Sequence, residues 1–157
     1  MIKKTFLPIM VLCFITELTA SQSIEQIGLK NFTSDGCSMF IEGTYKDPKL
    51  WCQCCLDHDL EYWQGGTKQQ RLQADLTFKE CVYDKTKNST LSQAMYDGVR
   101  IGGSPYMPTW YRWGYGWKKG WMQGRGYTPV SIQEKNVIEK YLTETNIFEV
   151  TSRHICD

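Results

Sequence analysis

One stretch of this 157-residue chain, CCLDHDLEYWQGG at residues 54–66, constrains the fold more than any other. Two adjacent cysteines begin it, a histidine between two carboxylates follows one helical turn later, and a glycine pair ends it. Helix formers fill the middle and the glycines suit a helix C-cap, so we expect a helix that ends at Gln64. Residues four apart share a helix face, so His58 and Tyr62 should point together. Asp59 is rotated from them by about 100° and can face a different partner.

A second helix is expected over residues 68–86, with Thr67 or a neighbour as its N-cap. Its apolar face includes Asp75, which stands between an alanine and a leucine. A buried carboxylate needs a partner, and His58 is the obvious one if the two helices pack antiparallel across the short glycine connection. A solvent-exposed Asp75 is the alternative.

The N-terminus has the pattern of a secretory signal peptide over residues 1–20, with two lysines, an apolar run and a cleavage site near Ala20. We therefore expect a secreted or periplasmic protein with a single mature domain over residues 21–157. Six of the seven cysteines lie in that domain, and an even number predicts three disulfides with fifteen possible pairings. A zinc site of cysteines and His58 is disfavoured, because the cysteine spacing is unlike that of zinc sites.

The charge balance excludes one class of function. Loss of the signal peptide removes two of 18 basic residues and one of 17 acidic residues, which leaves a formal charge of zero. A strongly basic nucleic-acid-binding protein is therefore not expected.

Residues 101–128, which we call the aromatic segment, are unusual in composition. They contain eight tyrosines and tryptophans with interleaved glycines and several basic residues, and no acidic residue lies between positions 98 and 133. Such a segment can pack irregularly on helices, or it can contact a phospholipid membrane surface. Aromatic and basic residues together also bind nucleic acids or sugars, so three interpretations remain open.

Shorter elements complete a mainly α fold. We expect a short helix over residues 21–32, a helix over 89–100 and a last helix over 131–143. The expected caps are Ser21 or Ser23, Ser89 or Thr90, and Ser131 in a capping box. Residues 147–155 alternate weakly and are interpreted as a short strand or a tail, held by Cys156.

The loop over residues 33–53 is long enough to have a function. It begins with the turn-forming run Thr-Ser-Asp-Gly-Cys-Ser. Hard cations such as calcium bind carboxylate and carbonyl oxygens, so Asp35, Gly36 and Ser38 are candidate ligands. The alternative is a surface loop tethered by a disulfide.

The central histidine suits general-base catalysis. A neutral His58 paired with a carboxylate can accept a proton from water. A cation beside it would polarise an ester carbonyl and stabilise the oxyanion. No serine stands in a nucleophile-elbow motif, so an acyl-enzyme route has no support.

Residues 35–81 resemble the core of secreted phospholipase A2. The matching positions are Cys54, Cys55, His58, Asp59, Tyr62, Asp75 and Cys81. The resemblance implies two long antiparallel helices joined by a disulfide. It also implies that His58 is the general base, that Asp75 orients it and that Tyr62 supports this aspartate. Asp59 is then the calcium-binding carboxylate, together with the loop around Ser38. The implied reaction is calcium-dependent hydrolysis of the sn-2 acyl ester, which releases fatty acid and lysophospholipid.

The cysteines agree with this resemblance. It implies one bridge between the two long helices and one from the first of them to the calcium loop, and we predict that the two remaining cysteines pair. The expected disulfides are Cys54–Cys81, Cys37–Cys55 and Cys52–Cys156. A further bridge of the family is absent, because Glu61 and Ala74 occupy its two positions.

Two parts of the chain depart from the family. The loop has one glycine around its cysteine, where the family is glycine-rich, and a bulky Phe40. Residues 98–157 match nothing in the well-known secreted enzymes. The alternative function is therefore a non-catalytic secreted protein that binds lipid, a membrane or another partner on the same scaffold.

Overall fold

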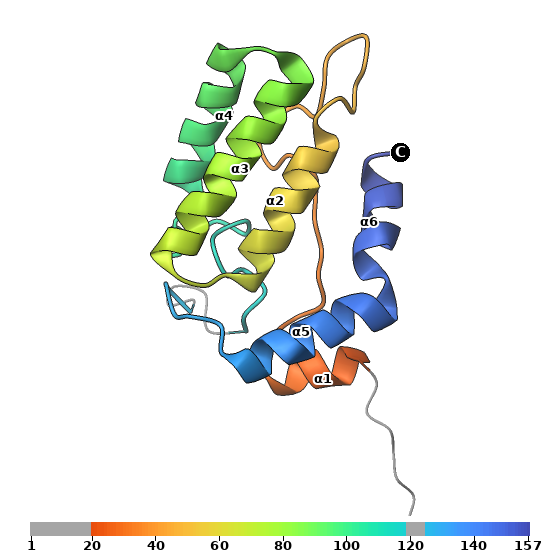
Figure 1. Cartoon of the computed structure of the whole chain (residues 1–157), viewed down its shortest axis with the longest axis vertical. Helices are drawn as coiled ribbons and strands as arrows, with labels where there is room; N and C mark the ends of the chain where they lie inside the picture. The colour runs from red at the N-terminus through yellow and green to blue at the C-terminus, as the bar shows by residue number, and fades with distance from the viewer. Residues whose placement is uncertain (1–19, 119–124) are drawn as a thin grey trace, which may run out of the picture.

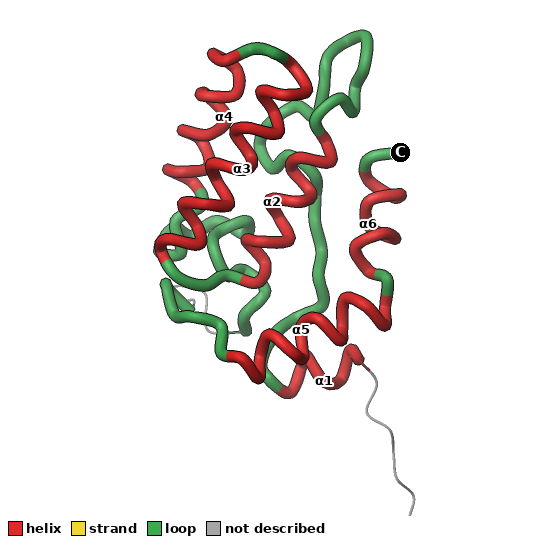
Figure 2. The backbone as a smooth tube through the Cα atoms, viewed as in Figure 1, coloured by secondary structure: helices red, strands yellow, loops and turns green. Residues whose placement is uncertain are grey.

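The computed structural model describes residues 20–118 and 125–157 (Figure 1). The helices are α1 (Ala20–Gln26), α2 (Cys52–Gln64), α3 (Lys68–Thr86), α4 (Ser89–Gly102), α5 (Ile132–Thr145) and α6 (Ile147–Ile155). No strand forms within these residues (Figure 2). One isolated antiparallel bridge joins Leu29 to Trp117. The expected mainly helical class is confirmed. The predicted signal peptide lies outside the described residues except for Ala20.

Helices α2, α3 and α4 run antiparallel to their neighbours and form one layer (Figure 1). The turn between α2 and α3 depends on Gly65 and Gly66, whose φ angles are 67° and 138°. A Cβ atom on Gly65 would lie 2.8 Å from the Cα of Gly114, so this position also requires the absence of a side chain. Thr67 and Gln70 then form a capping box that starts α3.

The connection between α3 and α4 corrects a prediction. The backbone of Lys87 is left-handed and ends α3, and the side chain of Asn88 accepts a hydrogen bond from the Leu91 N–H at 3.0 Å. Asn88 is therefore the N-cap of α4, and the expectation of Ser89 or Thr90 is wrong by one or two residues. Asparagine is as effective a cap as serine, so the sequence alone offers three candidates here.

Helix α1 packs against α5 at the lower end of the molecule (Figure 1). It is shorter than expected, because Gly28 turns the chain with φ 82° just after it ends. Ser21 and Ser23 lie within this helix and so are not its caps. The surrounding core consists of Ile24, Leu29, Phe32, Leu56, Trp63, Ile138 and Tyr141.

Residues 147–155 form the helix α6, so the prediction of a strand or tail is wrong. Ile147 and Phe148 pack against the core, and Glu149 lies in the first turn. Arg153 and His154 lie in the last turn, and charges of these signs at these ends favour a helix. Cys156 at the end of α6 is joined to the start of α2 by a disulfide.

Part of the aromatic segment packs against the turn between α2 and α3. The indole N–H groups of Trp113 and Trp117 donate to the carbonyls of Gly66 and Gln64 at 2.8 and 2.7 Å, which fixes the turn between α2 and α3. Both indoles are buried, whereas Trp110 remains 65% exposed. The packing interpretation therefore holds for two tryptophans. Residues 119–124 of the segment lie outside the described part of the chain.

Six cysteines lie in the described residues, and all of them form disulfides. The pairs are those expected: Cys37–Cys55, Cys52–Cys156 and Cys54–Cys81. No thiolate is left among them for a zinc site. In the part of the chain that the structure describes, no helix has the length and apolar character needed to cross a bilayer.

Candidate active site

His58 and Asp75 form the centre of the candidate site. They lie on the antiparallel helices α2 and α3, which the Cys54–Cys81 disulfide ties together. Nε2 of His58 is 2.8 Å from Oδ1 of Asp75, and the residues are 8% and 0% exposed. Asp75 is therefore not a solvent-exposed helix residue but the buried partner of the histidine.

The surroundings of Asp75 determine the tautomer of His58. Burial acts to raise the Asp75 pKa, but hydrogen bonds from His58 and Tyr62 outweigh it, and the pKa lies below its ordinary value. A carboxylate only accepts hydrogen bonds, so the neutral histidine carries its proton on Nε2. Nδ1 then has a free lone pair, and no described residue donates a hydrogen bond to it. This is the arrangement that a general base requires.

Tyr62 supports the pair from the same helix. Its hydroxyl donates to Oδ1 of Asp75 at 2.7 Å and accepts a hydrogen bond from Nε of Arg71 at 3.0 Å. The ring centroids of Tyr62 and Phe78 lie 4.2 and 4.7 Å from that of His58. The two aromatic rings thus restrict the orientation of the imidazole.

Two arginines complete the surroundings of Asp75, and neither is among the site residues predicted above. Arg100 donates from Nη1 to Oδ2 of Asp75, and Nε of Arg71 lies 3.8 Å from the same oxygen. Arg71 is 3% exposed, and its Nη groups donate to the carbonyls of Val99 and Arg100 and to the Tyr127 hydroxyl. Asp75 therefore belongs to a buried network that joins α2, α3 and the end of α4.

A sequence signal exists for only one of these arginines. Arg71 precedes Asp75 by four residues on α3, the spacing at which a helix places opposite charges together. Arg100 comes from another helix, and no local pattern relates it to Asp75.

Asp59 faces the loop instead of Asp75, as its rotation on the helix predicts. The Ser34 hydroxyl donates to Oδ2 of Asp59 at 2.6 Å. Burial raises the pKa of Asp59 to about 7; the Ser34 hydrogen bond opposes this shift, and the charge of Asp35 adds to it. Among the described residues no cation pairs with Asp59. A buried carboxylate near a second carboxylate is a favourable place for a cation.

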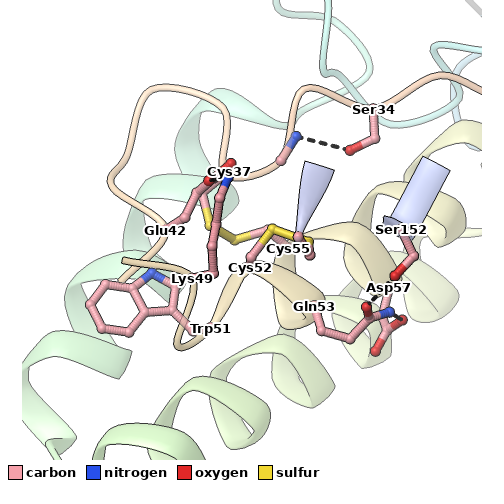
Figure 3. Close-up of a disulfide and its surroundings, with 12 residues drawn as sticks. Ser34, Cys37, Glu42, Lys49, Trp51, Cys52, Gln53, Cys55, Asp57 and Ser152 are labelled. Atoms are coloured by element: carbon pink, nitrogen blue, oxygen red, sulfur yellow. Dashed lines mark hydrogen bonds and ion pairs between the residues drawn. A yellow bond between two sulfur atoms is a disulfide. The ribbon is translucent and has the colours of Figure 1, made fainter. Parts of the chain in front are cut away.

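The loop is attached to α2 at two points near this carboxylate. The Cys37–Cys55 disulfide is one, and the Ser34–Asp59 hydrogen bond is the other. Figure 3 shows Ser34 on the loop above the disulfide, where its Oγ accepts a hydrogen bond from the Gly36 N–H at 3.0 Å. These two attachments hold the loop against the part of α2 that carries Cys55 and Asp59.

The predicted calcium ligands lie around two neighbouring cavities. Asp35, Ser38 and Asp59 line one cavity of about 370 Å³ with Ser34. Gly36 lines the cavity next to it, and its carbonyl accepts a hydrogen bond from the Ser38 N–H at 3.0 Å. Carboxylate, hydroxyl and carbonyl oxygens fit a hard cation. Within the described residues no three His, Cys, Asp or Glu side chains form a metal-binding group, so hydroxyl or backbone oxygens would have to supplement the two carboxylates.

An apolar cavity of about 260 Å³ lies beside His58 and Asp59. Its apolar lining comes from the loop, from α3 and α4, and from the aromatic segment: Met39, Phe40, Phe78, Met95, Val99 and Tyr111. An apolar cavity with a few polar groups at one end suits an alkyl chain that carries a polar function.

A further cavity lies beside His58, between α2 and α3. Glu61 and Ala74, the positions at which the resemblance to phospholipase A2 would place a further bridge, line this cavity of about 370 Å³ together with His58. Burial raises the pKa of Glu61, and the neighbouring His58 opposes the shift. This cavity leaves space between α2 and α3 next to the imidazole.

Comparison of the chain with protein-family models, with curated proteins and with solved structures finds no match in any of the three. A functional assignment therefore depends on the geometry of the site and on the resemblance of residues 35–81 to phospholipase A2.

Proposed function

We propose that the protein is a phospholipase A2-like hydrolase, with a fold related to that family, which cleaves an acyl ester of a phospholipid. One observation carries the proposal: the imidazole of His58 is held by a buried carboxylate beside an apolar cavity. The first feature supplies a base, and the second supplies a place for the acyl chain.

In the proposed reaction, Nδ1 of His58 takes a proton from a water molecule as the water oxygen bonds to the ester carbonyl carbon. Asp75 holds the ring through Nε2–H and stabilises the imidazolium that forms. When the carbon–oxygen bond to the glycerol breaks, the imidazolium returns the proton to the departing alkoxide. The products are a fatty acid and a lysophospholipid.

Calcium is part of this proposal. Asp59, Asp35 and the oxygens around Gly36 and Ser38 would hold it, and the bound ion would supply positive charge to the ester carbonyl. The buried, cation-free carboxylate of Asp59 supports this assignment.

The first test measures fatty acid release from mixed phospholipid vesicles by the oxidised mature protein, with calcium and with chelator. His58→Gln is expected to lose essentially all hydrolysis while its circular dichroism spectrum stays unchanged, because glutamine cannot act as the base. His154→Gln is the matched control, since His154 is the other histidine and lies exposed on α6. A fully active His58→Gln protein would exclude the mechanism.

The calcium assignment has a separate test by isothermal titration calorimetry. Asp59→Asn is expected to weaken calcium binding by at least roughly tenfold, the effect of losing one ion–carboxylate contact worth about 1.4 kcal/mol or more. Asp57→Asn, an exposed carboxylate on the same helix, should leave the affinity unchanged. Equal affinities of the two variants would place the ion elsewhere.

A non-catalytic lipid-binding protein is the second candidate. The observation in its favour is the loop at the cavity, where Met39, Phe40 and Ile41 are 79%, 44% and 66% exposed. Exposed apolar side chains at one place are typical of a surface that contacts lipid. Vesicle binding without any release of fatty acid, with and without calcium, would favour this candidate.

A further inference from the structure

A basic cavity of about 470 Å³ lies near the candidate active site and has a different chemistry. Lys30, Arg112 and Lys118 line it together with Asn31, Trp110 and Trp117, and no acidic residue is among its described lining residues. The mature chain has no net charge, so three cations around one cavity are a local property of this place.

The basic cavity adjoins the cavity that contains Asp35 and Asp59. Thr33, Trp110 and Tyr115 line both the basic cavity and the cavity that contains Asp35 and Asp59. That acidic cavity in turn shares Ser38, Asp59 and Tyr111 with the apolar cavity of His58. The acidic cavity is therefore the neighbour of both the apolar cavity and the basic cavity.

Backbone hydrogen bonds hold together the two segments that carry Lys30 and Lys118. The Lys30 N–H donates to the Gly116 carbonyl and the Lys118 N–H donates to the Gly28 carbonyl, both at 2.8 Å, on either side of the Leu29–Trp117 bridge. The Lys30 carbonyl also accepts a hydrogen bond from the buried Trp63 indole at 2.9 Å. These bonds hold the two segments side by side before any ligand binds.

The charges of the cavity are largely available to a ligand. The Lys30 ammonium has no ion pair among the described residues, and Arg112 uses only Nη1, which donates to the Thr109 carbonyl. Lys118 pairs with Glu25 at 3.3 Å, but both side chains are about half exposed, and such surface pairs are weak. A guanidinium and an ammonium with free N–H groups are the usual partners of a phosphate.

We propose that the basic cavity binds the anionic, phosphate-bearing headgroup of a phospholipid whose acyl ester lies at His58. This inference rests on the proposed hydrolysis and names its substrate class. An acyl chain in the apolar cavity and an ester at His58 place the headgroup beyond Asp59, at the cations. A headgroup without a positive charge, such as glycerol phosphate, is favoured there, and the trimethylammonium of choline is repelled by Lys30, Arg112 and Lys118.

The vesicle experiment compares phosphatidylglycerol with phosphatidylcholine. In the Lys30→Ala/Arg112→Ala variant, the rate on phosphatidylglycerol divided by the rate on phosphatidylcholine is expected to fall roughly tenfold. This is the effect of losing about one charge-assisted hydrogen bond. Lys46→Ala/Lys135→Ala removes the same charge from exposed positions outside the cavity and should leave the ratio unchanged. Lys30→Ala alone, at an exposed side chain, repeats the test if the double variant does not fold. An unchanged ratio in both variants overturns the proposal.

A binding experiment separates this proposal from hydrolysis itself. The His58→Gln protein is titrated by calorimetry with glycerophosphoglycerol and with inorganic phosphate. Tighter binding of glycerophosphoglycerol, lost in the added Lys30→Ala/Arg112→Ala background, supports a lipid headgroup site. Equal binding of both probes, lost in that background, supports the anion site but assigns it to free phosphate. Binding of neither probe overturns the proposal, and absence of hydrolysis by the native protein overturns only the proposed function.

Discussion

At the scale of single residues, the carboxylate of Asp75 has an unusual number of donors. His58 and Tyr62 bond to one oxygen, and Arg100 contacts the other with Arg71 close by. A buried charge is tolerated only when it is paired and hydrogen-bonded, and here the partners also join three helices. The aspartate that orients the histidine is therefore also a structural centre.

Tyr62→Phe tests this double role. The change removes one hydroxyl that donates to Asp75 and accepts from Arg71, and leaves both charged groups buried with one partner fewer. We expect the free energy of unfolding to fall by about 1.5–3 kcal/mol, with hydrolysis reduced but not abolished. Urea unfolding with Tyr45→Phe as the control checks this, since Tyr45 is fully exposed. Equal stability of the two variants would show that the hydroxyl carries no weight in the network.

The sequence predicts the pair of His58 and Asp75 because helical periodicity places His58 and Tyr62 on one face and leaves one carboxylate in the apolar face of the next helix. The same periodicity predicts that Asp59 points elsewhere. Arg100 is beyond such reasoning, because its contact with Asp75 depends on how α4 is positioned against α3, which is a property of packing and not of spacing.

At the scale of the helices, caps and turns are predictable because their interactions are local. The N-cap at Thr67 and the capping box at Ser131 are confirmed, as is the end of α2 at the two glycines. Helix α6 is missed because nine residues with weak alternation fit a strand as well as a helix. Its contacts with the core and its disulfide decide between the two.

The start of α5 should depend on pH. The Arg125 guanidinium is the main cause that lowers the pKa of Glu134 to about 2, and burial opposes the shift. A carboxyl whose pKa is lower in the folded state than its unfolded value near 4.5 stabilises the fold above that pH, and the contribution is lost as the pH falls toward 2.

We therefore expect the free energy of unfolding of Glu134→Gln to be about 0.5–1 kcal/mol below that of the native protein at pH 7. Between pH 6 and pH 3 it should decrease less than that of the native protein. Thermal unfolding at both pH values measures this. Glu139→Gln, an exposed position on the same helix, should keep the native pH dependence. A native-like pH dependence of Glu134→Gln would contradict the role of the Arg125 pair.

At the scale of the whole molecule, the three-helix layer is joined to the rest of the chain by one disulfide and by tryptophans. Trp113 and Trp117 bond to the turn between α2 and α3, and the Cys52–Cys156 disulfide connects α6 to the start of α2. Neither connection follows from local pattern, since each spans dozens of residues. The aromatic composition alone does not separate the buried indoles from the exposed Trp110.

Removal of the longest disulfide should cost more than removal of a shorter one. Cys52 and Cys156 are 104 residues apart, for which chain entropy gives about 4.7 kcal/mol, against about 3.5 kcal/mol for the 27 residues between Cys54 and Cys81. We expect Cys52→Ser/Cys156→Ser to unfold at a lower urea concentration than a variant that lacks the Cys54–Cys81 bridge. Hydrolysis should persist at 25 °C, because neither Cys52 nor Cys156 lines the cavity of His58. Loss of activity in a variant that remains folded would indicate that α6 shapes the site.

The same disulfide also sets an order on the maturation of the molecule. Cys37–Cys55 and Cys54–Cys81 close over 18 and 27 residues, but the partner of Cys52 does not exist until α3, α4, α5 and α6 have all been synthesised. During that time Cys52 lies within three residues of two bridges that its thiolate can attack, so disulfide exchange competes with correct pairing. Each such exchange releases either the loop that carries Asp35 or the link between α2 and α3. The yield of correctly assembled protein therefore depends on how fast Cys156, just after the last helix, pairs with Cys52.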